Sequence, residues 1–464
     1  MTKHLSSAGH AATRVSGSEF RAFITRLHFY VGLFVGPFIL VAALTGTLFV
    51  LTPQIETLIY ADQLRAQTQG EPRSLADQAQ AARSYIGQGP RLFAMRPAPK
   101  AGATTRVMFS QPGLGDSESR AIFVDPVSLR IQGDLIVYGT SGNLPLRTTI
   151  DYLHRHLLLG EIGRVYSELA ASWLWIAALG GVLLWSWQSN QAARTGVGRL
   201  RRLHSTTGIW LAVGLVFLSI TGLTWSKWAG DHIDQARGYL GWTTPSVTTK
   251  LTGVSSGTGS SEHASHGTHD PGVSPIAGDP SILLDDIQFV ARQGGIDSPF
   301  IEIRPAKAAD QAWLVREYDR SWPTQVDTIA IDPSTLSVVS RADFETFPLI
   351  AKLIRWGIDA HMGVLFGLPN QLLLAATGFV LTTMIALGYA MWWKRRPSAG
   401  VMPKTLIAAW VRLSPAIKVA TVAVAIGLGW ALPLMGVSTL AFIVVDALRW
   451  KIALSMWDAQ QSLI

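Results

Sequence analysis

The 464-residue sequence contains no cysteine, and only 15% of its residues are charged. Without cysteine the chain has no thiol catalysis, no disulfides and no thiolate-bound Fe–S cluster, which leaves histidine as its main soft metal ligand. The low charge content matters because an average soluble protein has roughly 25% charged residues. Membrane-crossing segments produce such a shortfall, and 48% of this sequence is hydrophobic.

Four runs without a single charge are close to the ~20 residues that a helix needs to cross a bilayer: residues 29–51, 169–187, 207–226 and 372–393. A fifth uncharged run, 419–445, is interrupted by Pro433 and Gly436. This interruption favours a tight hairpin of two short spans over one long kinked helix. The first run is too long for a signal peptide and lacks a clear cleavage site of small residues, so we expect an uncleaved span.

The net charge of +8 is concentrated beside the spans. The N-terminal arm, residues 188–203 and residues 394–415 are basic, and Glu19 is their one acidic residue. The positive-inside rule places these short segments in the cytoplasm and the two long segments between spans outside. The charge therefore indicates topology and not nucleic-acid binding.

The chain is a tandem repeat. Arg-Leu-His at 26–28 recurs at 202–204, and Thr45-Gly46 recurs at the same offset as Thr221-Gly222. Further on, matches continue at a larger offset: Ser74 with Ser281, Asp125 with Asp332, His154 with His361, Gly160 with Gly367, Gly181 with Gly388 and Trp185 with Trp392. The change of offset indicates an insertion, which we place at the Gly/Ser-rich tract 252–280.

The two outward segments share a pattern typical of small α+β modules. A helix is predicted at 74–87 and at 281–294, followed by apolar alternations at 105–110 and 312–318. Each then has a strand that runs into an Asp-Pro turn, AIFVDP and TIAIDP. Neither segment contains a nucleophile motif, a phosphate loop or a paired-carboxylate signature, and the Asp-Pro pairs are typical of turns.

The predicted fold is an α-helical membrane protein with a four-helix transmembrane core from two tandem repeats, a C-terminal hairpin and two small α+β periplasmic modules. The expected divisions are a cytoplasmic arm 1–27, span 28–51, module 52–150, interfacial segment and span 151–187, cytoplasmic loop 188–203, span 204–226, module 227–355, interfacial segment and span 356–393, cytoplasmic loop 394–415, and hairpin 416–456.

Four histidines occupy matched ends of the four main spans. His28 and His204 lie near the cytoplasmic ends, and His154 and His361 precede the returning spans on the outer side. Ionisable residues at membrane depth are costly and usually functional, although one interfacial histidine can simply tolerate water. Zinc prefers clustered ligands, and two pairs at opposite faces cannot share one ion. Bis-imidazole haem needs one histidine from each of two helices at each level, which this pattern supplies.

Small residues accompany the histidines. At about 100° per residue, Gly32, Gly36 and Gly46 share a helix face with His28. The third span repeats the arrangement relative to His204 with Gly208, Ala212 and Gly222. Such a stripe, with Gly32 and Gly208 next to the histidines, would give a flat macrocycle clearance against the backbone. Small-residue helix packing also explains the glycines, but not the histidines.

These motifs resemble the PepSY-associated transmembrane family, which includes bacterial inner-membrane ferric-siderophore reductases. The resemblance rests on R-L-H-x3-G at 26–32 and 202–208, the two Thr-Gly pairs, L-H-R-H-L-L-L-G-E-I-G at 153–163, the aromatic span ends at 185–187 and 392–393, and the FVDP and AIDP turns. It covers nearly all of residues 20–450.

The resemblance implies a membrane reductase with two b-type haems. Electrons would pass from an inner donor, a quinol, a flavoprotein or a soluble reductant, through a haem at His28 and His204 to a haem at His154 and His361. A ferric siderophore in the periplasm would then be reduced to release Fe(II). His156 is an alternative to His154, because HRH offers two imidazoles within three residues.

Other residues carry weaker expectations. Arg26, Arg202 and Arg155 are candidates for haem propionate contacts, although the positive-inside rule accounts equally for the first two. The second repeat departs from the first with Asp359 and Met362 in DAHMGVLFG. The insertion contains His263, His266 and His269, a spacing that could bind a metal ion but is more typical of a solvated loop.

Two other classes of function remain open at this stage. A siderophore or metal transport accessory protein would use the repeats as a path, but the spans lack the matched broken helices of many transporters. A regulatory protein would bind peptides with its outward modules and leave the histidines as spectators. Haem content separates the reductase from both.

Overall fold

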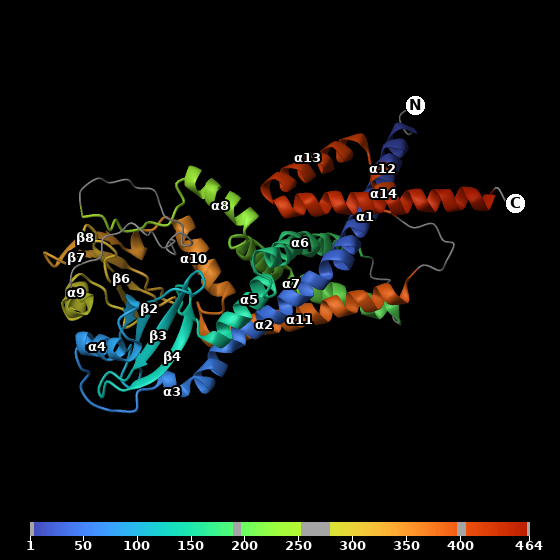
Figure 1. Ribbon diagram of the computed structural model, residues 1–464. Helices are drawn as coiled ribbons and strands as arrows, with labels where there is room; N and C mark the ends of the chain where they lie inside the picture. The colour runs from blue at the N-terminus through green and yellow to red at the C-terminus, as the bar shows by residue number, and fades with distance from the viewer. Residues whose placement is uncertain (1–3, 189–195, 252–278, 397–404, 462–464) are drawn as a thin grey trace. The chain divides into compact units, whose positions relative to one another are not determined.

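The computed structural model describes residues 4–188, 196–251, 279–396 and 405–461 (Figure 1). The predicted insertion at 252–280, with its three histidines, lies almost entirely outside these residues. The chain divides into two compact units. The helical unit comprises residues 1–47, 152–235 and 373–464, and the sheet unit comprises residues 48–151 and 236–372.

The first span is a continuous helical segment with a π-helical turn in it. Helix α1 (His4–Tyr30) passes into the π-helix η1 (Val31–Val35) and then into α2 (Gly36–Ile59). The Tyr389 hydroxyl donates a hydrogen bond to the Leu33 carbonyl at 2.9 Å, and Gly36 leaves room for the Tyr389 ring. A side chain that bonds into the helix ladder in this way is a recognised cause of a local π-turn. The turn interrupts the 3.6-residue period, so the predicted shared face of His28 and Gly36 is not continuous.

Five helical segments among the described residues are long and apolar enough to cross a membrane: Gly17–Ile59, Gly160–Ser186 (α6), Val197–Leu223 (α7), Gly367–Lys394 (α11) and Pro433–Ile452 within α14 (Pro433–Gln461). Helix α13 (Pro415–Ala431) is apolar but shorter. It forms a helical hairpin with α14 through Leu432, and the short α12 (Leu406–Val411) precedes it (Figure 1). The fold is thus a multi-pass helical one, as predicted.

The helical unit is apolar both inside and outside. Its core includes Val35 of η1, Trp173 of α6, Leu215 of α7 and Leu381 of α11. Trp210, by contrast, is 84% exposed on α7, and other large apolar side chains of the spans are exposed in the same way. Contiguous apolar surface of this kind marks a region that contacts lipid.

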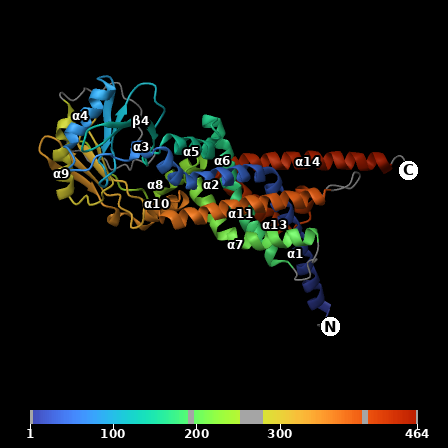
Figure 2. The ribbon, with the colours of Figure 1, turned by 90° about the horizontal axis from the view of Figure 1, so that it is seen from below.

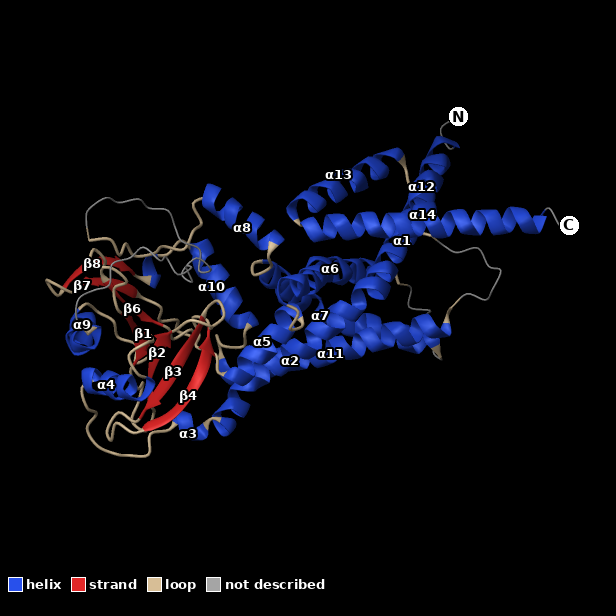
Figure 3. Ribbon diagram, in the orientation of Figure 1, coloured by secondary structure: helices blue, strands red, loops and turns tan. Residues whose placement is uncertain are grey.

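The sheet unit has one antiparallel eight-stranded sheet with the order β4-β3-β2-β1-β5-β6-β7-β8 (Figure 3). The first four strands come from the first outward segment: β1 (Arg91–Arg96), β2 (Thr105–Ser110), β3 (Glu118–Val124) and β4 (Ile131–Tyr138). The other four come from the second: β5 (Ile301–Arg304), β6 (Trp313–Glu317), β7 (Thr328–Asp332) and β8 (Ser337–Ala342). Met95 pairs with Ile303 where the two halves join. The sequence predicted the α+β pattern of each half, but not their shared sheet.

The helices of this unit cover one face of the sheet. Helix α4 (Leu75–Ile86) and helix α9 (Leu284–Gln293) pack against alternate strand residues such as Val107, Ile122 and Ile303 (Figures 1 and 3). The strand residues are fully buried because the period of two places every second side chain under the helices. The predicted helices at 74–87 and 281–294 and the strands at 105–110 and 312–318 are confirmed.

Shorter helical elements connect the strands and the spans. They are α3 (Ala61–Leu64), α5 (Pro145–His156), α8 (Trp228–Tyr239), the 3₁₀ turns η2 (Pro280–Leu283) and η3 (Phe344–Thr346), and α10 (Leu349–His361). Figure 2 shows α11, α7 and α14 from a second direction.

The first Asp-Pro pair forms a turn, as predicted. The buried Asp125 carboxylate accepts hydrogen bonds from the backbone N–H groups of Val127, Ser128, Gln67 and Thr68. Burial alone would raise the pKa of this carboxyl, but the backbone hydrogen bonds outweigh it and lower the pKa to about 2. Asp125 thus stabilises the fold and is no acid catalyst.

Candidate histidine site in the membrane helices

The imidazole rings of His28 on α1 and His204 on α7 lie next to each other within the helical unit. Their ring centroids are 6.4 Å apart and their planes cross at 81°. Metal–imidazole nitrogen bonds are about 2 Å long, so two rings on opposite sides of one metal ion have centroids about 6 Å apart. The observed centroid spacing is therefore close to that expected for two imidazoles that bind one metal ion.

The second nitrogen of His204 is already engaged. Its Nδ1 lies 3.0 Å from the carbonyl oxygen of Met384 on α11. Because a carbonyl oxygen can only accept, Nδ1 carries the proton and Nε2 keeps its lone pair. Metal-binding histidines are held by this kind of hydrogen bond to a carbonyl group.

The Nδ1 atom of His28 is buried and lacks a well-formed hydrogen bond. No such bond is formed among the described residues, although the Ala177 carbonyl lies nearby. No carboxylate of the described chain pairs with His28 or His204. Buried polar groups without partners are uncommon in folded proteins and point to a strained group or a missing ligand.

Glycines on the returning spans make room for both rings. A Cβ atom at Gly181 of α6 would lie 3.4 Å from Cε1 of His28, and one at Gly388 of α11 would lie 3.8 Å from Cε1 of His204. Gly181 and Gly388 are repeat mates, so each histidine faces the equivalent glycine of its own repeat. Gly180 also faces His28. An alanine Cβ would make an ordinary contact at these positions, whereas a leucine would displace the rings.

Gly32 and Gly208 are the glycines that the sequence named for macrocycle clearance, and this role stays a prediction. A Cβ atom at Gly32 would meet nothing within 4 Å, and one at Gly208 would meet the Met384 sulfur at 3.4 Å. Neither position is in contact with a histidine ring. The sequence did contain the signal for the contacting pair, since Gly181 and Gly388 match in the repeat. It could not show that they face His28 and His204, because this depends on how separate helices pack.

His154 is held near the C-terminal end of α5 by the first span. Its Nδ1 lies 2.9 Å from the Thr45 hydroxyl oxygen, and a Cβ atom at Gly46 would lie only 3.1 Å from its Cε1. The Tyr166 hydroxyl donates to the His154 backbone carbonyl at 2.7 Å. The Thr-Gly pair of the first repeat therefore touches the imidazole directly.

His156, the alternative ligand, has different surroundings. Its ring lies 5.0 Å from that of Tyr152, one turn earlier on α5. The chain then turns sharply through Leu157 and Leu158, which both have positive φ angles (54° and 59°). Such left-handed backbone is costly for leucine and tends to be kept where function needs it. In the first repeat, the His154 ring contacts the first span through Thr45 and Gly46, whereas the His156 backbone carbonyl lies against Gly163 of α6.

His361 is the last residue of α10 and belongs to the sheet unit. Its pairing with His154 stays a prediction. Asp359, where the second repeat departs from the first, is fully buried and forms salt bridges with Arg320 at 2.5 Å and Arg355 at 3.2 Å. These salt bridges explain why the second repeat has an aspartate at this position. Met362 caps the helix and is also buried.

The three arginines proposed for propionates differ in exposure. Arg202 is exposed, whereas Arg26 and Arg155 are half-buried. Arg26 lies in the electrostatic neighbourhood of Asp446 on α14. A role at a propionate remains a prediction for all three.

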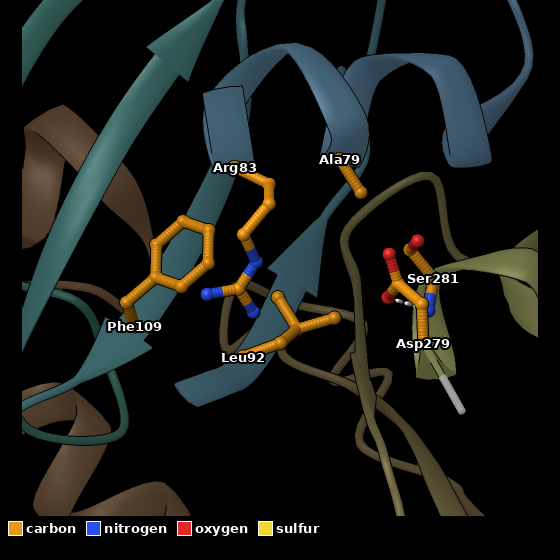
Figure 4. Close-up of a pocket in the computed structure, with 6 residues that line it drawn as sticks. All are labelled: Ala79, Arg83, Leu92, Phe109, Asp279 and Ser281. Atoms are coloured by element: carbon orange, nitrogen blue, oxygen red, sulfur yellow. Dashed lines mark hydrogen bonds between the residues drawn. The ribbon is translucent and has the colours of Figure 1, made fainter. Parts of the chain in front are cut away.

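Other chemistry is not apparent in the described part of the chain. It contains no group of three or more His, Asp or Glu side chains that could hold a metal ion. A small pocket in the sheet unit is lined by Ala79, Arg83, Leu92, Phe109, Asp279 and Ser281 (Figure 4). Arg83 there donates to the Pro90 carbonyl and stacks on Phe109, and Asp279 caps the turn at Ser281. These side chains are occupied by local structure.

Taken together, the apolar spans, the antiparallel sheet and the paired histidines define a multi-pass membrane protein built from two tandem repeats. The profile of the PepSY-associated TM region matches residues 25–395, and the chain belongs to this family. The match covers both repeats and ends before α12, α13 and α14. None of the curated proteins compared with the chain matches it.

Proposed function

We propose that this protein is a di-haem oxidoreductase that passes electrons across the bacterial inner membrane and reduces a ferric siderophore. The observation that carries the proposal is the His28–His204 pair, with ring centroids 6.4 Å apart on two apolar spans. Bound haem would supply reversible one-electron chemistry at iron.

The residues around the inner pair support an axial-ligand role. The Met384 carbonyl fixes His204 with its Nε2 lone pair available, and Gly181 and Gly388 give the two rings space. Both histidines are on membrane spans of different repeats, so one metal centre would tie the two repeats together. A proton relay would instead call for carboxylates beside the rings, and no carboxylate pairs with either ring among the described residues.

The outer haem would use His154 and His361, with His156 as the alternative in the first repeat. This assignment rests on the tandem repeat and on the contacts of His154 with Thr45 and Gly46. By the positive-inside rule, the basic segments favour a cytoplasmic N-terminus, and the sheet unit would then lie in the periplasm. Electrons would then leave from the periplasmic side.

The reaction transfers one electron to each ferric chelate. A donor on the inner side, such as a quinol, a flavoprotein or a soluble reductant, is oxidised, and Fe(III) becomes Fe(II). Fe(II) is held weakly by siderophores and is released.

A vesicle assay tests this reaction. The purified protein is reconstituted into lipid vesicles that enclose dithionite, a ferric hydroxamate is added outside, and an Fe(II)-specific dye reports reduction. We expect dye formation with the wild-type protein and none with His204→Ala. Equal rates in protein-free vesicles and with wild-type protein would contradict the proposal.

A further inference from the structure

The Thr45 hydroxyl contacts the outer histidine and also lies within hydrogen-bond distance of its own helix. Its hydroxyl lies 2.7 Å from the Val41 carbonyl, one helical turn earlier, and 3.3 Å from the Ala42 carbonyl. Threonines in helices donate to such carbonyls routinely. A hydroxyl has one proton, so when that proton is donated to the Val41 carbonyl, the Thr45 oxygen acts towards His154 as an acceptor.

The geometry points to Thr45 as a positioning residue for His154, an inference that rests on the proposed haem function. In the tautomer that we infer, His154 Nδ1 carries the proton and donates to the Thr45 oxygen at 2.9 Å, and Nε2 keeps the lone pair that a metal ion requires. Thr45 is only 5% exposed, so water does not compete for this hydrogen bond.

The hydrogen bond also affects the ligand itself. An imidazole that donates from Nδ1 to an acceptor becomes more basic at Nε2 and binds ferric iron more tightly. Thr45 therefore lowers the midpoint potential of the haem that His154 ligates. It does so without touching the iron.

Gly46 completes the arrangement. A Cβ atom there would sit 3.1 Å from the His154 ring, too close without a shift of the imidazole. In the Thr-Gly pair, threonine thus orients the ring and glycine leaves it room. Thr221, the repeat mate of Thr45, donates to the Phe217 carbonyl at 2.7 Å in the same manner, which leaves its oxygen an acceptor too.

The test uses the full-length protein with His204→Ala as background, so that only the outer haem remains to be titrated. Thr45→Val is added, because valine keeps the branched shape but removes the acceptor. We expect a higher midpoint potential for the remaining haem and a lower haem content per protein. Thr45→Ser should restore both. Thr47→Val is the matched control, since Thr47 makes the same bond to the Ala43 carbonyl at 2.7 Å on the same helix.

Each outcome is decisive. An unchanged potential with full haem content in Thr45→Val would overturn the inference, and so would a lower potential, which is expected if Thr45 donates to Nδ1. An equal shift in Thr47→Val would also overturn it, because the effect would then belong to the helix. Failure of the proposed function looks different: the wild-type protein itself would contain no haem, and both ideas would fall.

Discussion

Buried polar side chains are satisfied differently in the sheet unit and in the helical unit. In the sheet unit, Glu302 is only 1% exposed and is surrounded by Arg96, Arg304 and Arg316, which all form salt bridges with it. Burial alone would raise the pKa of the Glu302 carboxyl, but the three guanidinium groups hold it well below its usual range. These charges compensate one another within the fold.

The helical unit also satisfies its buried acids. Glu168 accepts from the backbone N–H groups of Trp228 and Ala229, both at 3.0 Å, and Asp446 accepts from the Tyr30 hydroxyl and the Ile407 N–H. The Nδ1 atom of His28, near the Ala177 backbone, is one of several buried polar atoms without a geometrically satisfactory hydrogen bond among the described residues, as is Ser172 Oγ on α6. The buried acids of both units are thus satisfied within the fold, whereas a bound ligand at the histidine pair is our proposal.

The largest expected effect is the loss of one haem when a histidine of the His28–His204 pair is replaced. His28→Ala and His204→Ala should each remove the same, inner haem, because one metal ion cannot keep a bis-imidazole site with one ring. A pyridine haemochrome count should fall from about two to about one per chain in both variants. His232→Ala is the control, since this histidine contacts the Ala431 carbonyl on α13 and no other histidine in the described chain. Loss of both haems from one folded single variant would contradict the pairing.

The second effect concerns the sheet unit. Glu302→Gln leaves three arginines around an uncharged amide, and breaking a buried ion pair costs about 3–5 kcal/mol. We expect a clear drop in the unfolding temperature with haem content per folded protein unchanged. Asp134→Asn is the matched control, because the Arg120–Asp134 pair is partly exposed and such pairs contribute only about 0–1 kcal/mol. Equal decreases of the unfolding temperature in the two variants would show that the burial of the Glu302 ion pairs does not add to stability.

A smaller effect is expected from the glycine beside His28. Gly181→Leu should displace the ring and lower the inner haem content, whereas Gly181→Ala should be nearly neutral, because its Cβ would make an ordinary contact at 3.4 Å. Gly427→Leu is the control, since nothing lies within 4 Å of a Cβ atom there. Haem content and the absorption spectrum measure the effect. Normal haem content in Gly181→Leu would argue against a macrocycle at this ring.

The smallest effect is limited to acid pH. The folded pKa of Asp125 is about 2, below the value of about 3.9 for an unfolded aspartate. Its contribution to stability is therefore fully present above about pH 4 and is lost as the pH falls towards about 2. Unfolding followed by tryptophan fluorescence should show a weaker pH dependence in this window for Asp125→Asn. An identical pH profile would mean that the turn carboxylate does not titrate with folding.

The sequence predicted the local features well. Charge-free runs, the tandem repeat and the strand alternations depend on neighbouring residues, and the structure has apolar helices and β2 at the expected residues. Contacts between distant elements were not predictable. The pairing of Met95 with Ile303, the hydrogen bond of Tyr389 to the π-turn and the approach of Gly388 to His204 depend on packing between segments far apart in the chain.

The site was predictable in part for the same reason. The repeat singled out the four histidines, and the structure places two of them, His28 and His204, ring to ring. The repeat did not reveal that Thr45 contacts His154. This contact depends on how α5 packs against the first span, and no pattern in the sequence indicates that packing.

The most direct test of the central claim is an absorption spectrum of the detergent-purified protein, oxidised and then reduced with dithionite, together with a pyridine haemochrome count. A sharp α-band on reduction and about two b-type haems per chain are the predicted result. A colourless protein that also fails to take up added haem would contradict the account, and the paired histidines would then serve helix packing alone.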